Sequence, residues 1–441
     1  MKQLIIAIFC LSTVQLKAQT TNELDSIVKA FDKANFFHGV ISVSKNGKVL
    51  LSKGYGLADA ESRKMNDPSL AFQIGSVNKQ FTAVAILKLQ EEGKLNVQDK
   101  LSRYFPELPH SDMITLHHLL THTSGLYNYT NDTTFWMREA SFSSSKEKMI
   151  SRFSGRPLDF EPGTKYNYSN SGYLLLGYII EKVSGKPYEK YMRENIFNPL
   201  GMTHTGFDFT KPFPKATGYY DNGTVFSKAM IVDSSASHAA GAMYSTLADL
   251  HKWVDAMHQK KLISKESWKA AFTPYMDDYG YGFVRQSRDG KEMIWHNGGI
   301  HGFVSHLVYF PESNASIIVL SNYMQSNLGD LVTTLYLALN GKAYHLPKQR
   351  GEIEVPVTVL QQYAGSYELV PGFVITVTVE GNQLMAQATG QQNFPLFAEK
   401  EDFFFYKVVD AQIKFEKGPD GKVSHLVLFQ NGRELKGQKT R

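Results

Sequence analysis

Ser76 and Lys79 stand three residues apart at the start of an apolar stretch, a spacing that can pair a nucleophile with a base. The stretch continues through Phe81 to Gly93 and predicts a helix with Ser76 in its first turn. Residues three apart share a helix face, so the Lys79 amine can point at the Ser76 hydroxyl, and free N–H groups at the helix start can face an oxyanion. A buried lysine has a lowered pKa and can take the hydroxyl proton. Alone the pattern is weak, because it recurs by chance and serine is also an ordinary N-cap.

Two further segments carry groups that suit acyl transfer. Residues 166–170 read Tyr-Asn-Tyr-Ser-Asn before a helical pattern, so Tyr168 and Asn170 are expected on a loop ahead of a helix. There a phenol can relay a proton and an amide can hold a substrate carbonyl. Residues 295–299 read Trp-His-Asn-Gly-Gly at the end of a predicted strand, where the glycines allow close approach of a substrate backbone.

Together the three segments resemble those of the serine β-lactamase and penicillin-binding protein family, in which S-x-x-K is a known signature. The Tyr-x-Asn form of the second segment is similar to the class C, peptidase S12 and esterase-like branch. Two supporting segments also resemble that branch, namely residues 119–126 (LLTHTSGL) and 173–177 (YLLLG). The resemblance covers about residues 20 to 340.

The resemblance implies a role for each residue of these segments. Ser76 would be the acylated nucleophile, Lys79 its base partner, and Tyr168 the acid/base that protonates the leaving group. The oxyanion hole would comprise the backbone N–H groups of Ser76 and of a residue near Gly299. The substrate-binding and oxyanion residues implied in this way are Asn170, His296, Gly298 and Gly299.

The third segment departs from the lactam-binding pattern, because His296 stands where those enzymes usually have lysine. Histidine is mostly uncharged at neutral pH unless its surroundings raise its pKa, whereas a β-lactam or peptide carboxylate pairs with a fixed cation. The sequence therefore favours hydrolysis of esters, D-amino-acid peptides or related amides. A β-lactamase, a DD-peptidase, a penicillin-binding sensor that acylates without turnover, and a scaffold with a relic motif are the alternatives.

Other chemistries gain little support. His118 and His122 have the spacing of zinc ligands on a helix, but no H-E-x-x-H acid accompanies them, so neither metal nor cofactor is expected. The absence of G-x-S-x-G argues against an α/β-hydrolase. Four aromatic residues are expected either to wall a substrate cleft or to pack inside: Tyr127, Tyr129, Phe135 and Trp136.

The N-terminus has the pattern of a signal peptide. Lys2 precedes an apolar stretch over residues 4–14, and Ala18 is a small residue at a suitable cleavage point. Residues 1–18 are therefore predicted to be removed, and the protein to be secreted or periplasmic. The only cysteine, Cys10, lies in that segment, which excludes cysteine chemistry from the mature chain. Bulky Phe9 before it disfavours a lipid anchor.

Charge and hydropathy limit the partners. The net charge of +5 arises from 47 basic and 42 acidic residues with no basic block, so nucleic-acid binding is not expected. No later segment has the roughly 18 uninterrupted apolar residues of a membrane span. The expected partner is a small-molecule or peptide substrate, and a homo-oligomer is compatible with the sequence.

The elements that must position these residues fall into two predicted domains, since 441 residues exceed what one core usually organises. A helix opens the first domain and is followed by a hairpin over residues 39–54. Strands return at residues 281–285, 293–295, 303–310 and 317–320. Such a sheet around a helical middle predicts an α+β, β-lactamase/transpeptidase-like domain over residues 19–345. Turn signals after residue 355 predict a small all-β barrel over residues 355–441, which resembles a lipocalin-like domain.

Overall fold

The computed structural model describes residues 20–221, 226–324, 326, 328–430 and 433–440, so the predicted signal peptide lies outside the described residues. The chain divides into two compact units. The first comprises Met1–Leu24, His38–Tyr219 and Lys228–Met324, and the second comprises Asp25–Phe37, Tyr220–Ser227 and Gln325–Arg441. This division is not linear along the chain, and the predicted domain limits at residues 345 and 355 stay predictions.

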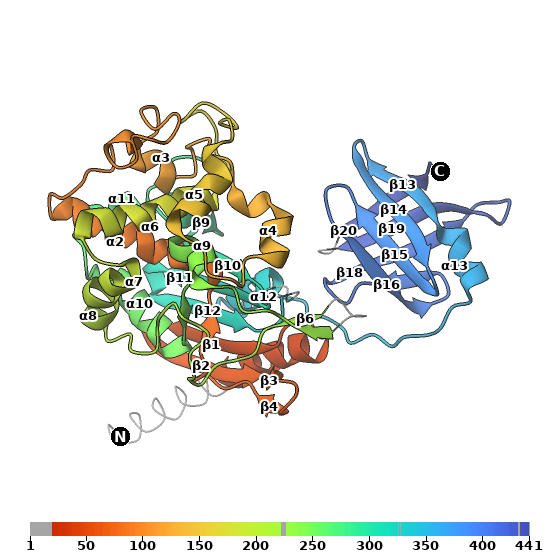
Figure 1. The fold of residues 1–441 in the computed structure, drawn as a ribbon. Helices are drawn as coiled ribbons and strands as arrows, with labels where there is room; N and C mark the ends of the chain where they lie inside the picture. The colour runs from red at the N-terminus through yellow and green to blue at the C-terminus, as the bar shows by residue number, and fades with distance from the viewer. Residues whose placement is uncertain (1–19, 222–225, 325, 327, 431–432, 441) are drawn as a thin grey trace, which may run out of the picture. The chain divides into compact units, whose positions relative to one another are not determined.

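An antiparallel six-stranded sheet is the centre of the first unit, with strand order β2-β1-β12-β11-β10-β9 (Figure 1). Strand β1 pairs with β12, so segments from both ends of the unit meet in mid-sheet, as the alternating pattern of residues 39–54 and the later apolar runs predict. The strands are β1 (Gly39–Lys45), β2 (Lys48–Tyr55), β9 (Val284–Arg288), β10 (Lys291–Ile300), β11 (Phe303–Phe310) and β12 (Ala315–Ser321). Strand β9 begins later than predicted, and β10 runs on through residues 295–299.

The rest of the first unit is mainly helical, with a few short strands. Helix α2 packs against α6 and α9, while α10 packs against β1 and β12. Because α2 lies between other elements, most of its residues are buried, and Phe81 stacks on Trp253 of α10 with 3.9 Å between ring centroids. The helices are α2 (Asn78–Glu91), α3 (Leu116–Leu120), α4 (Thr133–Arg138), α5 (Lys146–Ser154), α6 (Asn170–Ser184), α7 (Tyr188–Met192), α8 (Asn198–Leu200), α9 (Ser234–Gly241), α10 (Leu247–Gln259) and α11 (Lys265–Phe272).

The second unit contains a closed barrel in which each strand pairs with the next and β13 pairs with β20 (Figure 1). Closure leaves no open sheet edge. Phe404 and Phe415 fill its core together with Tyr363, whose ring stacks on that of Phe415 at 4.3 Å. The strands are β13 (Gly365–Val370), β14 (Phe373–Glu380), β15 (Gln383–Ala388), β16 (Asn393–Lys400), β17 (Phe403–Phe405), β18 (Ala411–Lys417), β19 (Val423–Gln430) and β20 (Arg433–Lys439).

The second unit also holds α12 (Leu328–Leu339) and α13 (Val357–Tyr363). Residues 20–33 form the first helix of the described chain. The predicted α+β class of the first unit and the predicted all-β barrel at the C-terminus are confirmed. Among the described residues, no helix combines the length and the apolar character that crossing a membrane requires.

Candidate active site

Ser76 lies in a single 3₁₀ turn, Gly75–Val77, that leads directly into α2. Gly75 has φ of +50°, a left-handed conformation that favours glycine. A Cβ at Gly75 would also come within 2.7 Å of the backbone nitrogen of Gly299. The turn therefore depends on this glycine, and it presents a half-buried Ser76 two residues before α2 begins.

Lys79 is fully buried, and its amine has three oxygen partners. Nζ lies 2.9 Å from Ser76 Oγ, 2.7 Å from Asn170 Oδ1 and 2.7 Å from the carbonyl oxygen of Ala240. Burial lowers the pKa of Lys79 well below its usual value, which favours the neutral amine. A neutral amine has two N–H groups and one lone pair. The two carbonyl oxygens can accept both hydrogens, so the lone pair is left to face the Ser76 hydroxyl.

Tyr168 approaches the same hydroxyl from the loop before α6. Its phenol donates a hydrogen bond of 2.7 Å to Ser76 Oγ. Burial raises the pKa of Tyr168 above its usual value, so the phenol keeps its proton near neutral pH. The structure thus brings together the predicted hydroxyl, amine and phenol around one oxygen atom.

Asn170 is the first residue of α6, where a loop position was expected. Its Nδ2 donates to Thr130 Oγ1 at 2.9 Å, and its backbone N–H donates to Asn128 Oδ1 at 3.0 Å. These bonds turn the amide oxygen of Asn170 toward Lys79. Sequence analysis missed Asn128 and Thr130 although both follow the segment 119–126 closely, because only the fold shows that they meet Asn170.

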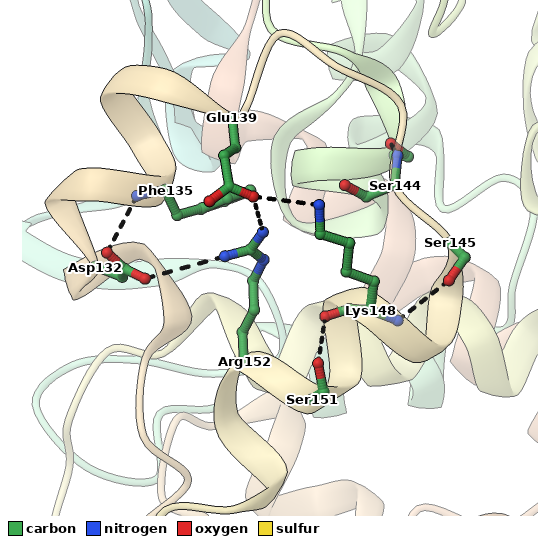
Figure 2. A network of polar contacts seen from close by, with 9 residues as sticks. Asp132, Phe135, Glu139, Ser144, Ser145, Lys148, Ser151 and Arg152 are labelled. Atoms are coloured by element: carbon green, nitrogen blue, oxygen red, sulfur yellow. Dashed lines mark hydrogen bonds and ion pairs between the residues drawn. The ribbon is translucent and has the colours of Figure 1, made fainter.

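The turn that carries Thr130, Tyr129–Asn131, runs into α4, and a charged cluster holds α4 to α5 (Figure 2). Asp132 caps α4 by accepting from the backbone N–H of Phe135 at 3.1 Å. Arg152 of α5 donates to Glu139 at 2.7 Å and lies 4.0 Å from Asp132. Exposed ion pairs contribute little singly, but the Arg152 side chain is only 12% exposed. The cluster therefore orders the segment that orients the Asn170 amide.

The carbonyl partner of Lys79 comes from the end of α9, where helix carbonyls lack intrahelical donors. His238 interrupts α9 with φ of +36° and ψ of −127°, a sparsely populated conformation. Beyond this kink, the Ala239 oxygen accepts from Thr82 Oγ1 at 2.7 Å and the Ala240 oxygen accepts from Lys79. The kink thus aims two carbonyls at α2, and sequence analysis missed both, since a backbone acceptor leaves no residue-type signal.

Strand β10 passes directly against the backbone that carries Ser76. A Cβ at Gly298 would lie 2.1 Å from the Ile74 carbonyl oxygen and 2.9 Å from the Ser76 backbone nitrogen. At Gly299 an added Cβ would meet only the end of the Met324 side chain, at 3.6 Å. The two predicted glycines therefore differ, because the protein's own backbone occupies the space beside Gly298.

His296 is buried, with 2% of its surface exposed. Its Nδ1 donates to the Asn297 carbonyl oxygen at 2.6 Å, which leaves Nε2 to accept from the Tyr279 hydroxyl at 2.9 Å. Burial lowers the pKa of His296 to about 3. His296 is therefore a neutral side chain whose two ring nitrogens both have partners.

The remaining predicted candidates have packing contacts of their own. The three histidines of residues 117–122 each use Nδ1 for a separate partner: Tyr281 for His117, Thr115 for His118 and Ser169 for His122. Within the described ranges, no group of three or more His, Cys, Asp or Glu side chains is arranged to hold a metal ion. Of the four aromatic candidates, Tyr129 and Phe135 are core residues, while Tyr127 and Trp136 are partly buried against that core.

Comparison with known proteins finds two matching family models and several relatives of this chain. Residues 24–341 match the family described as Beta-lactamase, and residues 349–439 match a domain of unknown function, DUF3471. Penicillin-binding protein 4* of Bacillus subtilis is 28% identical over 97% of this chain and 100% of its own length. A teichoic acid D-alanine hydrolase of Staphylococcus aureus is 31% identical over 68% of this chain and 75% of its own.

A solved structure has a similar fold. The octameric penicillin-binding protein homologue of Pyrococcus abyssi superimposes with a TM-score of 0.66 and 27% identity. The match covers 94% of this chain and 99% of that one. It therefore includes residues from both units.

The asymmetry between the glycines predicts different outcomes for the same substitution. We expect Gly298→Ala to destabilise the first unit by about 1–3 kcal/mol, because the new methyl group must displace the Ile74 carbonyl beside Ser76. We expect Gly299→Ala to change stability by less than about 0.5 kcal/mol, since its methyl group meets only a flexible side-chain end. Denaturant unfolding of both variants measures the difference, and equal destabilisation would contradict the close approach of β10 to Ile74.

Proposed function

The chain belongs to the beta-lactamase family and is a serine hydrolase of that type, and we propose that it is a secreted enzyme that cleaves ester or amide bonds through an acyl-enzyme on Ser76. One observation carries the proposal: Lys79 Nζ and the Tyr168 hydroxyl lie 2.9 Å and 2.7 Å from Ser76 Oγ. These distances suit proton transfer to and from the nucleophile. D-amino-acid and peptide substrates fall within the proposed range, and one relative is named as a teichoic acid D-alanine hydrolase.

In the proposed acylation step, Ser76 Oγ attacks the substrate carbonyl carbon while the neutral Lys79 amine takes the hydroxyl proton. The backbone N–H groups of Ser76 and of β10 near Gly299 stabilise the oxyanion. Tyr168 then gives its phenol proton to the leaving oxygen or nitrogen as that bond breaks. The products of this step are the acyl-enzyme, a free alcohol or amine, a Lys79 ammonium and a Tyr168 phenolate.

Deacylation restores the starting state. A water molecule attacks the acyl carbon and gives one proton to the Tyr168 phenolate, which becomes a phenol again. As the bond to Ser76 breaks, the Lys79 ammonium returns its proton to Oγ. Protons balance over the cycle, and the carboxylic acid product carries the second proton of the water until it ionises.

Burial supports this division of roles, since it disfavours the charged form of every group it covers. It lowers the pKa of Lys79, so the amine is available as a base. It raises the pKa of Tyr168, so the phenol is available as an acid. Two groups whose pKa values are moved in opposite directions are suited to act as an acid and base pair.

The neutral state of His296 supports substrates that have no carboxylate next to the scissile bond. A fixed cation at this place would pair with such a carboxylate, whereas His296 has both ring nitrogens engaged within the protein. Esters and amides, including those of D-amino acids, fit this environment better than β-lactams or free peptide C-termini. A β-lactamase, a DD-peptidase or a penicillin-binding sensor is the competing function.

The setting of the enzyme is part of the proposal. The N-terminal pattern that ends at Ala18 supports cleavage there and a secreted or periplasmic location. The octameric homologue from Pyrococcus abyssi supports a homo-oligomer for this chain too.

Replacement of the nucleophile tests the proposal directly. We expect Ser76→Ala to lower kcat/KM for p-nitrophenyl esters by at least about 10³-fold while the thermal unfolding temperature stays close to that of the wild type. Mass spectrometry of the wild type during turnover should show a transient acyl adduct on Ser76. Wild-type rates in the variant would refute the acyl-enzyme, and a penicillin adduct that persists for hours without turnover would favour the sensor.

The pH profile tests the proton roles. We expect kcat/KM for an uncharged ester to fall toward acid as Lys79 gains a proton, and to stay high up to about pH 10 because Tyr168 remains protonated. The pKa of His296, about 3, lies too low for this residue to cause the acid limb. His296→Gln should therefore keep that limb. Loss of the limb in this variant would identify His296, in place of Lys79, as the titrating group.

Charge at His296 tests the substrate class. We expect His296→Lys to raise the rate of acylation by benzylpenicillin about tenfold relative to hydrolysis of p-nitrophenyl acetate, because a cation would pair with the penicillin carboxylate. The neutral His296→Gln variant loses the same ring without adding charge and serves as the control. An unchanged ratio in a folded His296→Lys protein would show that this position does not select against carboxylates.

A further inference from the structure

His122 lies just beyond α3, in the segment 119–126, and takes no part in the proposed chemistry. Its backbone has φ of +58°, which is uncommon for a residue other than glycine. In this conformation His122 accepts hydrogen bonds from the residues before and after Tyr168. The backbone N–H of Asn167 donates to the His122 carbonyl oxygen at 2.9 Å, and that of Ser169 donates to His122 Nδ1 at 3.2 Å.

The imidazole ring of His122 also packs against the phenol ring. The two ring centroids lie 4.2 Å apart with an interplanar angle of 37°. Tyr279 and Tyr173 enclose the imidazole further, at 4.6 Å and 5.1 Å, and only 1% of the surface of His122 is exposed. The ring of Tyr168 is thus supported by a side chain that is itself held in place.

The hydrogen bond from Ser169 determines where the imidazole carries its proton. Since Nδ1 accepts, the neutral ring has its hydrogen on Nε2, and within the described residues Nε2 has no hydrogen-bond partner. A buried donor without a partner costs about 1–3 kcal/mol, which an apolar side chain would avoid. The side chain must therefore contribute something that an apolar one cannot, and the Nδ1 acceptor is the group that meets this requirement.

Tyr168 needs such support because its hydroxyl is occupied by the nucleophile. The one hydrogen bond that the described residues give this phenol goes to Ser76 Oγ, and that partner changes during acylation. A proton donor works only within about 2.6–3.2 Å of its target. Contacts with the backbone around Tyr168 and with the face of its ring must then hold this side chain in position. His122 makes contacts of both kinds.

We propose that His122 is a positioning residue, which holds Tyr168 in place for protonation of the leaving group by bonding the amides on both sides of it and by packing on its ring. This inference rests on the proposed acyl-enzyme function and on the proposed role of Tyr168 as the acid. It assigns the histidine of the segment 119–126 a role in positioning the proton donor and none in binding substrate or metal.

A pair of substrates with the same acyl group separates positioning from general loss of structure. A p-nitrophenyl ester releases a stable phenolate and needs little protonation, whereas the matching p-nitroanilide needs a proton on nitrogen before the bond breaks. The ratio of kcat/KM for the ester to kcat/KM for the anilide therefore reports the acid step. Tyr168→Phe should raise this ratio at least about tenfold.

Two amide substitutions of His122 place an acceptor at different distances from the backbone. Asn places its side-chain oxygen near the position of Nδ1 and tolerates a left-handed backbone, so we expect His122→Asn to keep the ratio within about threefold of the wild type. Gln reaches past that position, so His122→Gln should raise the ratio about tenfold or more. The double variant His122→Gln/Tyr168→Phe should show no further rise, because both changes remove one step.

His118, in the helix α3 that precedes His122, supplies a matched control. Its Nδ1 accepts from the backbone N–H of Thr115 at 3.3 Å in a capping box, so His118→Ala also removes a histidine bond to a backbone amide. This variant should lower the unfolding temperature and leave the ester-to-anilide ratio unchanged. A raised ratio in His118→Ala would show that any loosening of α3 affects the acid step, and would overturn a specific role for His122.

The outcomes separate this inference from the proposed function. If Tyr168→Phe leaves the ratio unchanged, the proposed acid role is wrong. If Tyr168→Phe raises the ratio while His122→Gln lowers both rates equally or changes neither, the acid role stands and the positioning role is wrong. Equal behaviour of His122→Asn and His122→Gln would likewise refute the Nδ1 acceptor as the feature that matters.

Discussion

The burial of one amine is the constraint on which the rest of the site depends. Lys79 projects from α2 into a region without solvent access, where a polar group must find protein partners. Two oxygens meet that need, Asn170 Oδ1 and the Ala240 carbonyl, and each comes from a different helix. The packing of α6 and α9 on α2 therefore supplies two of the three contacts of the Lys79 amine. The third contact is with the Ser76 hydroxyl.

Each oxygen requires its own local support. The Asn170 amide is oriented by Thr130 and Asn128, and the charged cluster of α4 and α5 in Figure 2 holds the turn that carries them. The Ala240 carbonyl is aimed by a kink at His238, where the backbone leaves helical geometry. Backbone strain is a cost that structures retain where an arrangement must be unique, and so is the ordering of the long charged side chains of such a cluster. The kink at His238 and the charged cluster both support the contacts of Lys79 Nζ.

The sequence predicted the side chains that meet at Ser76 Oγ and missed groups that support them by accepting hydrogen bonds. Ser76, Lys79 and Tyr168 belong to motifs with recognisable residue types, and the sheet strands follow from apolar runs between turn signals. The Ala240 carbonyl has no such signal, since every residue has one and only the tertiary fold decides which carbonyl meets Lys79. Thr130 was missed for the same reason: its role depends on how α6 approaches a distant turn.

The two glycines of β10 have different surroundings, although the sequence treats them alike. Sequence analysis took Gly298 and Gly299 alike as places where a substrate backbone comes close. In the structure the space beside Gly298 is filled by the Ile74 carbonyl, so this glycine is required before any substrate binds. The third segment thus shapes the site from within, because it fixes the backbone of the turn that presents Ser76. The positions of this strand that the sequence assigned to substrate binding therefore include one, Gly298, whose lack of a side chain lets β10 pack against the backbone beside Ser76.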